Sequence, residues 1–114
     1  PKRHHYCSAP GKLLLSTLSE PDLKVYFEHA KLIKFNKTTL ATEEEIRKEL
    51  EKIKKVGFST HNEEFLLGNF TISFPLWLDG KVKGAFSFMC PISEKAKIYN
   101  QKAINDIKTS LYQS

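Results

Sequence analysis

Apolar residues in the first quarter of the chain recur at the spacing of helical turns, and two capping residues divide them into two short helices. Ser8 offers a capping hydroxyl, and Pro10 suits a first helical turn, where its missing N–H would be unpaired anyway. Leucines then follow: Leu13, Leu14, Leu15 and Leu18. Ser19 is the second capping residue, and helically spaced residues follow it as well: Leu23, Tyr26 and Phe27. The pattern predicts two helices before residue 31.

A longer helix is predicted after residues 31–40, which we expect to be irregular or extended. Thr42 and Glu45 have the spacing of a capping box, and Gly57 is a natural helix end. One apolar stripe runs between them: Ile46, Leu50 and Ile53. Acid–base pairs four residues apart support this helix: Glu43–Arg47, Glu44–Lys48 and Glu51–Lys55.

After Gly57 the period of the apolar positions changes from helical to two-fold, which is typical of strands. We expect strands at residues 58–63, 69–78 and 81–90, with the last two joined in a hairpin at Asp79-Gly80. Pro75 inside a strand implies a sheet edge or a bulge. The predicted core face carries Ile72, Phe74, Leu76, Leu78, Val82, Phe86, Phe88 and Cys90. The opposite face is mixed and either lines a ligand cavity or meets solvent; it carries Thr71, Ser73, Pro75, Trp77, Lys83, Ala85, Ser87 and Met89.

A final helix is predicted from about Ser93 to Gln113, with an apolar stripe of Ile98, Ile104, Ile107 and Leu111. The order of elements is therefore three helices, the strands and a last helix. This order indicates an α+β fold in which helices pack on an antiparallel sheet.

Composition narrows the class of protein. The chain has 114 residues, enough for one domain, and its hydrophobic content of 40% is ordinary for a folded protein. Its net charge is +5, but only two of the 18 basic residues are arginine, so we expect a solvated lysine-rich surface rather than a nucleic-acid patch. Two cysteines make no disulfide framework, no apolar run approaches the roughly 20 residues of a membrane helix, and no signal peptide opens the chain. We expect a cytoplasmic protein that contacts no membrane.

His4, His5 and Cys7 lie close together in the sequence, which raises the question of a metal site. Zinc needs four ligands, and Cys90 is distant and on the expected core face, so we expect no metal. Cys7 also precedes a helix start, where the dipole would stabilise a thiolate, and His5 or His61 could serve as its base. A lone cysteine is more often a small buried hydrophobe. We therefore expect no catalytic residue, no cofactor and no enzyme activity.

The segment Ser-Ala-Pro-Gly-Lys at residues 8–12 lacks the spacing of a phosphate-binding loop. A loop whose N–H groups open onto a helix is nevertheless a reasonable anion site. The segment is therefore a candidate for binding a carboxylate.

Three landmarks, in order, resemble the effector-binding domain of IclR-type transcriptional regulators. The first is the small-residue, Gly-Lys helix start at residues 5–15, followed by Leu18-Ser19-Glu20. The second is Thr38-Thr39 before a charged helix that ends at residues 53–59. The third is a series in the second half: residues 62–64, Gly68, residues 72–76 and residues 80–91. Their order and spacing cover nearly the whole chain.

The resemblance implies a GAF-like fold and a pocket for a small-molecule effector, often a small organic acid. In the family this pocket is lined by the loop before the Gly-Lys helix, by an acidic position ahead of the Glu-Glu pair and by small polar strand residues. The candidate ligand-binding residues here are Ser8, Ala9, Pro10, Gly11, His61, Asn62, Thr71, Ser87 and Met89. Pro10 has no N–H to give an anion, neither His61 nor Asn62 is an acid, and Met89 is apolar. We therefore expect a ligand with more hydrocarbon than a two- or three-carbon acid.

The resemblance covers only the later part of the family's effector domain. We expect residues 1–114 to be a single effector-binding domain without a DNA-binding domain, so that DNA is reached only through a domain outside this chain. We also expect a dimer or tetramer, since the missing opening strands would leave a sheet edge uncovered. One alternative is a small catalytic domain that uses cysteine and histidine. Another is a winged-helix DNA-binding domain, but its recognition helix would be residues 42–55, which carry five acids and five bases.

Overall fold

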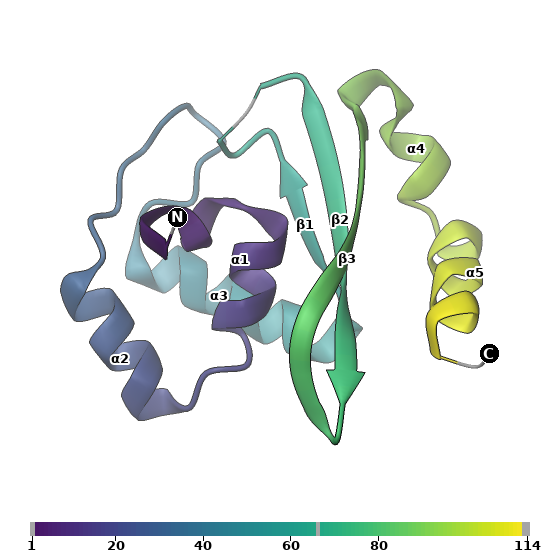
Figure 1. Cartoon of the computed structure of the whole chain (residues 1–114). Helices are drawn as coiled ribbons and strands as arrows, with labels where there is room; N and C mark the ends of the chain where they lie inside the picture. Colours follow the sequence, from purple (N-terminus) through teal and green to yellow (C-terminus); the bar gives the residue numbers. More distant parts are fainter. Residues whose placement is uncertain (1, 66, 113–114) are drawn as a thin grey trace.

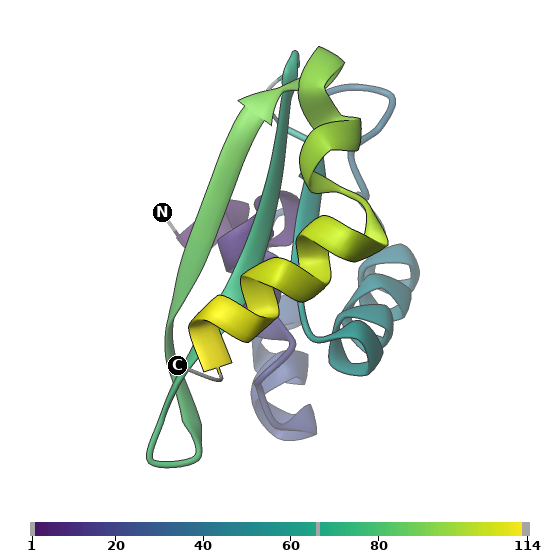
Figure 2. The same cartoon turned by 90° about the vertical axis from the view of Figure 1, so that its right-hand side faces the viewer.

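The computed structural model of the chain describes residues 2–65 and 67–112, with side chains from His5 onward. Within these residues, a three-stranded antiparallel sheet separates two groups of helices, which confirms the expected α+β fold (Figure 1). The strands lie in chain order: β1 (Ser59–Asn62), β2 (Asn69–Leu78) and β3 (Lys81–Pro91). One face is covered by the 3-10 helix η1 (Lys2–Cys7) and by α1 (Ala9–Leu15), α2 (Glu20–His29) and α3 (Glu43–Val56). The other carries the 3-10 helix η2 (Ile92–Glu94), α4 (Lys95–Ile98) and α5 (Gln101–Tyr112), as Figure 2 shows.

The predicted capping residues begin their helices as expected. The Ser8 hydroxyl accepts from the Gly11 N–H at 3.0 Å at the start of α1. At α3 the Thr42 hydroxyl accepts from the Glu45 N–H, and the Glu45 carboxylate accepts from the backbone of Ala41. Gly57 ends α3 with φ +81°, a conformation that side chains with a Cβ avoid. None of these described helices is long and apolar enough to cross a membrane.

The charged face of α3 is held by two of the three predicted pairs. Arg47 bonds Glu43 at 2.7 Å and reaches Glu20 of α2 as well. The Lys48–Glu44 distance is 3.8 Å, while Glu51 pairs with Lys54 rather than with Lys55. The difference is small in energy, because exposed pairs of this kind are worth a few tenths of a kcal/mol.

The irregular segment 30–42 is bonded to the N-terminal 3-10 helix η1, an element that the sequence pattern did not predict. The Tyr6 hydroxyl donates to the Ile33 carbonyl at 2.8 Å and accepts from the Ile33 N–H at 2.7 Å. Tyr6 is fully buried, so this double contact replaces the backbone pairing that the segment would make in a regular element.

The predicted hairpin between β2 and β3 is confirmed, but a bulge in it changes the side of the sheet on which one residue lies. Asp79 and Gly80 both have positive φ, +53° and +76°, as a tight hairpin turn requires. Beyond the turn, Trp77 pairs with Val82 and Leu76 pairs with Gly84, so Lys83 is the extra residue. The prediction that Val82 lies on the core face was therefore wrong, because the bulge turns it to the side of Trp77.

Pro75 lies where the chain tolerates a missing N–H. β2 is the central strand, but β1 pairs with it only as far as Ser73, so β2 is a local edge at Pro75. The Pro75 carbonyl accepts from the Tyr112 hydroxyl of α5 at 2.6 Å. The expected edge and the expected bulge are both present next to this proline.

Both faces of the sheet are covered by helices. The face of β2 predicted as the core meets α5 through Ile72 and Phe74, together with Phe70 and Ile104. The prediction was wrong for the outer part of this face of the sheet, because four of its residues are exposed: Leu76, Leu78, Phe86 and Phe88. A second cluster lies on the side of α1 and α3: Tyr6, Cys7, Leu13, Leu15, Leu23, Ile46, Leu50 and Ile53. The mixed face of the sheet points to this side, and α1 shields Thr71 and Ser73 from solvent while Ser87 and Met89 stay exposed.

The single C-terminal helix predicted over residues 93–113 was wrong. The chain turns sharply after α4, where Tyr99 leaves the helical conformation, and α5 starts afresh. Asn100 caps the new helix by accepting from the Ala103 N–H at 2.9 Å. Ile98 and Ile104 are six residues apart, and residues at this spacing do not lie on the same side of one helix. The spacing of the apolar stripe was therefore itself a sign of the break. Gln113 lies outside the described residues.

Candidate ligand-binding site

A pocket of about 230 Å³ lies between the start of α1 and the mixed face of the sheet. It is lined by Cys7, Ser8, Ala9, Pro10, His61, Phe65, Asn69, Thr71, Ser87 and Met89. A neighbouring hollow of about 310 Å³ shares Cys7, Ser8, Pro10 and Phe65 with it and extends to His5, Gly11 and Leu14. The mixed face therefore borders a cavity, and the walls of that cavity are mostly apolar.

The structure brings together seven of the nine candidate residues in this one pocket: Ser8, Ala9, Pro10, His61, Thr71, Ser87 and Met89. Gly11 lines the neighbouring hollow. Asn62 lines neither and is exposed, and its backbone N–H donates to the Glu64 carboxylate.

Three lining residues were not predicted: Cys7, Phe65 and Asn69. Asn69 shares the strand parity of Thr71, so the two-fold pattern could have included it. Cys7 is adjacent to the predicted loop. Phe65 lies in the irregular connection between β1 and β2, where no periodic signal exists.

The start of α1 uses two of its backbone donors within the helix. The Gly11 N–H bonds the Ser8 hydroxyl, the Lys12 N–H bonds the Ser8 carbonyl at 2.9 Å, and Pro10 has no N–H. In the segment 8–12, which was the candidate for binding a carboxylate, the N–H groups of Gly11 and Lys12 are therefore already used. The approach is also too close for a side chain at Gly11, because a Cβ there would lie 2.5 Å from the His5 backbone.

The pocket is lined by the buried hydroxyl of Thr71, by the more exposed hydroxyl of Ser87 and, at its rim, by a methionine. Thr71 is 8% exposed, and its side chain makes no hydrogen bond within the part of the chain that the structure describes. The Ser87 hydroxyl bonds that of Ser73 across the strands at 2.7 Å. Met89 pairs with Thr71 in the register and is 65% exposed. Thr71 therefore offers a donor and an acceptor to whatever enters.

His61 is held as a neutral ring. Its Nε2 accepts from the Phe65 N–H at 2.9 Å, which a protonated imidazole cannot do. Burial lowers the pKa of His61 below its usual value, against the opposing pull of the Glu64 charge. The ring thus fixes the loop that carries Phe65 into the pocket wall.

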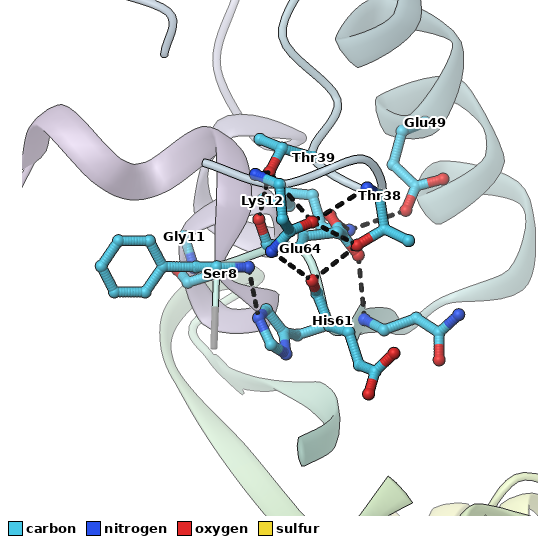
Figure 3. A network of polar contacts seen from close by, with 12 residues as sticks. Ser8, Gly11, Lys12, Thr38, Thr39, Glu49, His61 and Glu64 are labelled. Carbon is cyan, nitrogen blue, oxygen red and sulfur yellow. Dashed lines mark hydrogen bonds and ion pairs between the residues drawn. The ribbon is translucent and has the colours of Figure 1, made fainter. Parts of the chain in front are cut away.

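Directly behind the wall lies a buried ion cluster that the sequence analysis did not foresee (Figure 3). Lys12 is fully buried, and its Nζ lies 2.7 Å from a Glu64 oxygen and 2.8 Å from a Glu49 oxygen of α3. The other Glu64 oxygen accepts from the Asn62 N–H, and the Thr39 hydroxyl donates to the Glu64 carbonyl. The lysine of the Gly-Lys pair therefore points into the fold and joins α1, α3 and the β1–β2 connection.

Cys7 does not have the properties of a nucleophile. Burial first, and then the Glu64 charge, raise the pKa of its thiol to about 11, which weighs against the thiolate alternative, and Cys7 is a fully buried side chain as expected. Among the described residues, no group of three histidine, cysteine or acidic side chains is placed to hold a metal ion. The side chain of His4, named in the metal hypothesis, lies outside the described part.

Comparison with known proteins agrees with this geometry. The family model described as the bacterial transcriptional regulator IclR C-terminal domain matches residues 2–111. No curated protein sequence matches the chain.

Solved structures share the fold. The Thermotoga maritima IclR is 25% identical, with a TM-score of 0.76 over 96% of this chain and 43% of that one. The E. coli KdgR C-terminal domain is 21% identical, with a TM-score of 0.78 over 96% and 65%. A double mutant of the Acinetobacter PobR inducer-binding domain, in complex with 3-hydroxybenzoic acid, is 21% identical, with a TM-score of 0.79 over 96% and 61%. The chain spans less than two thirds of the length of each. Since the family model covers almost every residue, the chain belongs to the family of bacterial IclR C-terminal regulator domains.

Proposed function

We propose that this chain is a ligand-sensing domain of an IclR-type transcription factor and that its effector binds in the pocket between α1 and the sheet. The observation that carries the proposal is the convergence of seven candidate positions, far apart in sequence, on one cavity. A solved relative of the same fold has an inducer-binding domain in complex with a small aromatic acid, which supports a small molecule as the class of ligand. The role is regulatory rather than enzymatic.

The rest of the proposed regulator lies outside this chain. Residues 1–114 serve as one effector-binding domain, and DNA is contacted through another domain of the same cytoplasmic protein. The mixed charges of α3 support this division, because a recognition helix would carry a basic face toward the phosphates.

Self-association is the second part of the proposed role. β3 is an edge strand of the described sheet and carries exposed apolar side chains, Phe86, Phe88 and Met89. Edges of this kind pair with other strands unless they are blocked. Sedimentation of the chain should show a dimer or tetramer, and a strict monomer at high concentration would contradict this part.

The ligand site is tested by binding to matched variants. Native mass spectrometry of the purified chain should first show a co-purified small molecule, and a panel of neutral and acidic single-ring compounds provides the ligand otherwise. Thr71→Val should weaken binding about tenfold or more, because a lost partner for a buried polar group costs about 1–3 kcal/mol. Ser87→Ala should weaken it less, because the Ser87 side chain is exposed and its hydroxyl is bonded to Ser73. Ser110→Ala, on the exposed side of α5, is the control. Equal affinities for all four proteins would place the cavity elsewhere.

A further inference from the structure

The charges around the pocket bear on the kind of ligand it accepts. No Lys, Arg, Asp or Glu side chain of the described residues lines it, and the one ionisable ring, His61, is held neutral by the Phe65 N–H. A carboxylate that enters an apolar cavity loses its hydration, and this cost is large unless a cation or several donors replace the water. The lining supplies no such cation.

The nearest buried cation is already neutralised. The Lys12 ammonium lies between the carboxylates of Glu64 and Glu49, so the cluster behind the wall combines one positive with two negative charges (Figure 3). Its net effect on the pocket is therefore that of an anion. An entering carboxylate would be repelled by this cluster rather than attracted to it.

The charges of the ion cluster affect the pKa values of two groups in the pocket wall, Cys7 and His61, in the same direction. Burial is the main cause of the altered pKa of both Cys7 and His61, and charge comes second. At each group the negative charge of Glu64 acts more strongly than the positive charge of Lys12. At both groups the Glu64 charge therefore opposes a further negative charge more than the Lys12 charge favours it.

Three of the five residues at the start of α1, Ser8 to Lys12, give no backbone donor to a ligand. The N–H groups of Gly11 and Lys12 are bonded to Ser8, and Pro10 has none. What the pocket does offer is the buried Thr71 hydroxyl, together with Ser87 and Asn69 near it. These groups suit a neutral ligand that both donates and accepts a hydrogen bond.

We propose that the pocket selects an uncharged, largely apolar ligand, a ring with one hydroxyl or amide group, and discriminates against the corresponding carboxylate. The inference rests on the proposed function of the same pocket and names its ligand class. The volume agrees, since about 230 Å³ exceeds the ~150 Å³ of an apolar cavity that accepts benzene. The extra space holds the polar group beside Thr71.

The test compares benzyl alcohol with benzoate, which have the same ring and differ in charge. Each is titrated into the 114-residue chain at pH 7, and NMR follows the methyl groups of Thr71 and Met89. We expect benzyl alcohol to shift both methyls and to bind at least about tenfold more tightly than benzoate. Benzoate binding at these methyls with equal or higher affinity would overturn the inference but support the proposed function. Shifts by neither probe would overturn both.

A charge-gain variant tests the electrostatic reason. Met89→Lys places an ammonium at the exposed rim of the pocket, and Met89→Gln is the matched control of similar length without charge. The lysine variant should bind benzoate about tenfold more tightly than the wild type, because a charge-assisted hydrogen bond becomes available. The glutamine variant should show no such gain. A lysine variant with unchanged benzoate affinity would overturn the electrostatic basis of the proposal.

Discussion

Replacing Lys12 by methionine should reveal how strongly the fold depends on the buried ion cluster. Methionine fills nearly the same space as lysine, so the change removes the ammonium with little change in packing. Glu64, whose side chain is 7% exposed, and Glu49, at 20%, are then left facing one another without a cation. Each loses a contact of 2.7 to 2.8 Å.

The magnitude follows from the geometry. At these distances and an effective dielectric constant of ~20, each contact is worth about 6 kcal/mol before desolvation. The removal of one partner from a buried pair typically costs about 3–5 kcal/mol, since the other charge stays buried. Glu49 is partly solvated and relaxes toward water, so we expect a loss of about 3 kcal/mol. Such a loss is a large fraction of the stability of a small domain.

Urea unfolding at pH 7, followed by circular dichroism, measures this loss. Lys54→Met is the matched control, because Lys54 is half exposed and its pair with Glu51 is 3.4 Å long. The control should change stability by about 0.5 kcal/mol or less. Adding Glu64→Gln to Lys12→Met should recover part of the loss by removing the more deeply buried unpaired charge. A Lys12→Met variant within about 1 kcal/mol of wild type would refute the view that the cluster holds α1 to α3.

Three further outcomes are expected. Gly11→Ala should destabilise the chain by about 1–3 kcal/mol in thermal melts, because its Cβ would lie 2.5 Å from backbone, whereas Gly84→Ala, with 3.6 Å to its nearest neighbour, should be close to neutral. Because the pKa of His61 is lowered, stability should fall as the pH drops below 6.5 toward that lowered pKa, and His61→Gln should lose this component of the pH profile. Iodoacetamide at pH 7 should modify Cys90 before the buried Cys7, as peptide mass spectrometry would show; faster modification of Cys7 would contradict its raised pKa.

The sequence predicted the elements wherever a local signal determines the backbone. Capping hydroxyls at Ser8, Ser19 and Thr42 act within three residues of themselves, so their helices began where expected. The turn at Asp79-Gly80 is local in the same sense. The bulge beside Trp77 is a feature of the pairing between two strands, which no single residue signals, and so the predicted facing of Val82 was wrong.

The sequence predicted which positions line one pocket to the extent that strand parity and the position of the loop determine it, and whether a ligand binds there stays a prediction. Thr71, Ser87 and Met89 share one parity, and the helix start lies above them. Phe65 could not be predicted, because it enters the wall from an irregular connection fixed by a single bond to His61. The direction of the Lys12 side chain could not be predicted either, since its partners Glu49 and Glu64 are 37 and 52 residues away in the sequence.

The orientation of Lys12 connects the fold to the chemistry of the pocket. Small residues followed by Gly-Lys have the composition of an anion-binding loop, in which the lysine and the N–H groups face the ligand. Here the same residue types face inward: Gly11 closes the helix start, and Lys12 bonds two carboxylates from other elements. The Gly11 N–H and the Lys12 ammonium, which would bind an anion in such a loop, bond other groups of the protein here and stabilise the fold. The wall that this leaves facing the pocket, Ser8 to Pro10, presents mostly apolar surface, which is why the cavity suits an uncharged ligand.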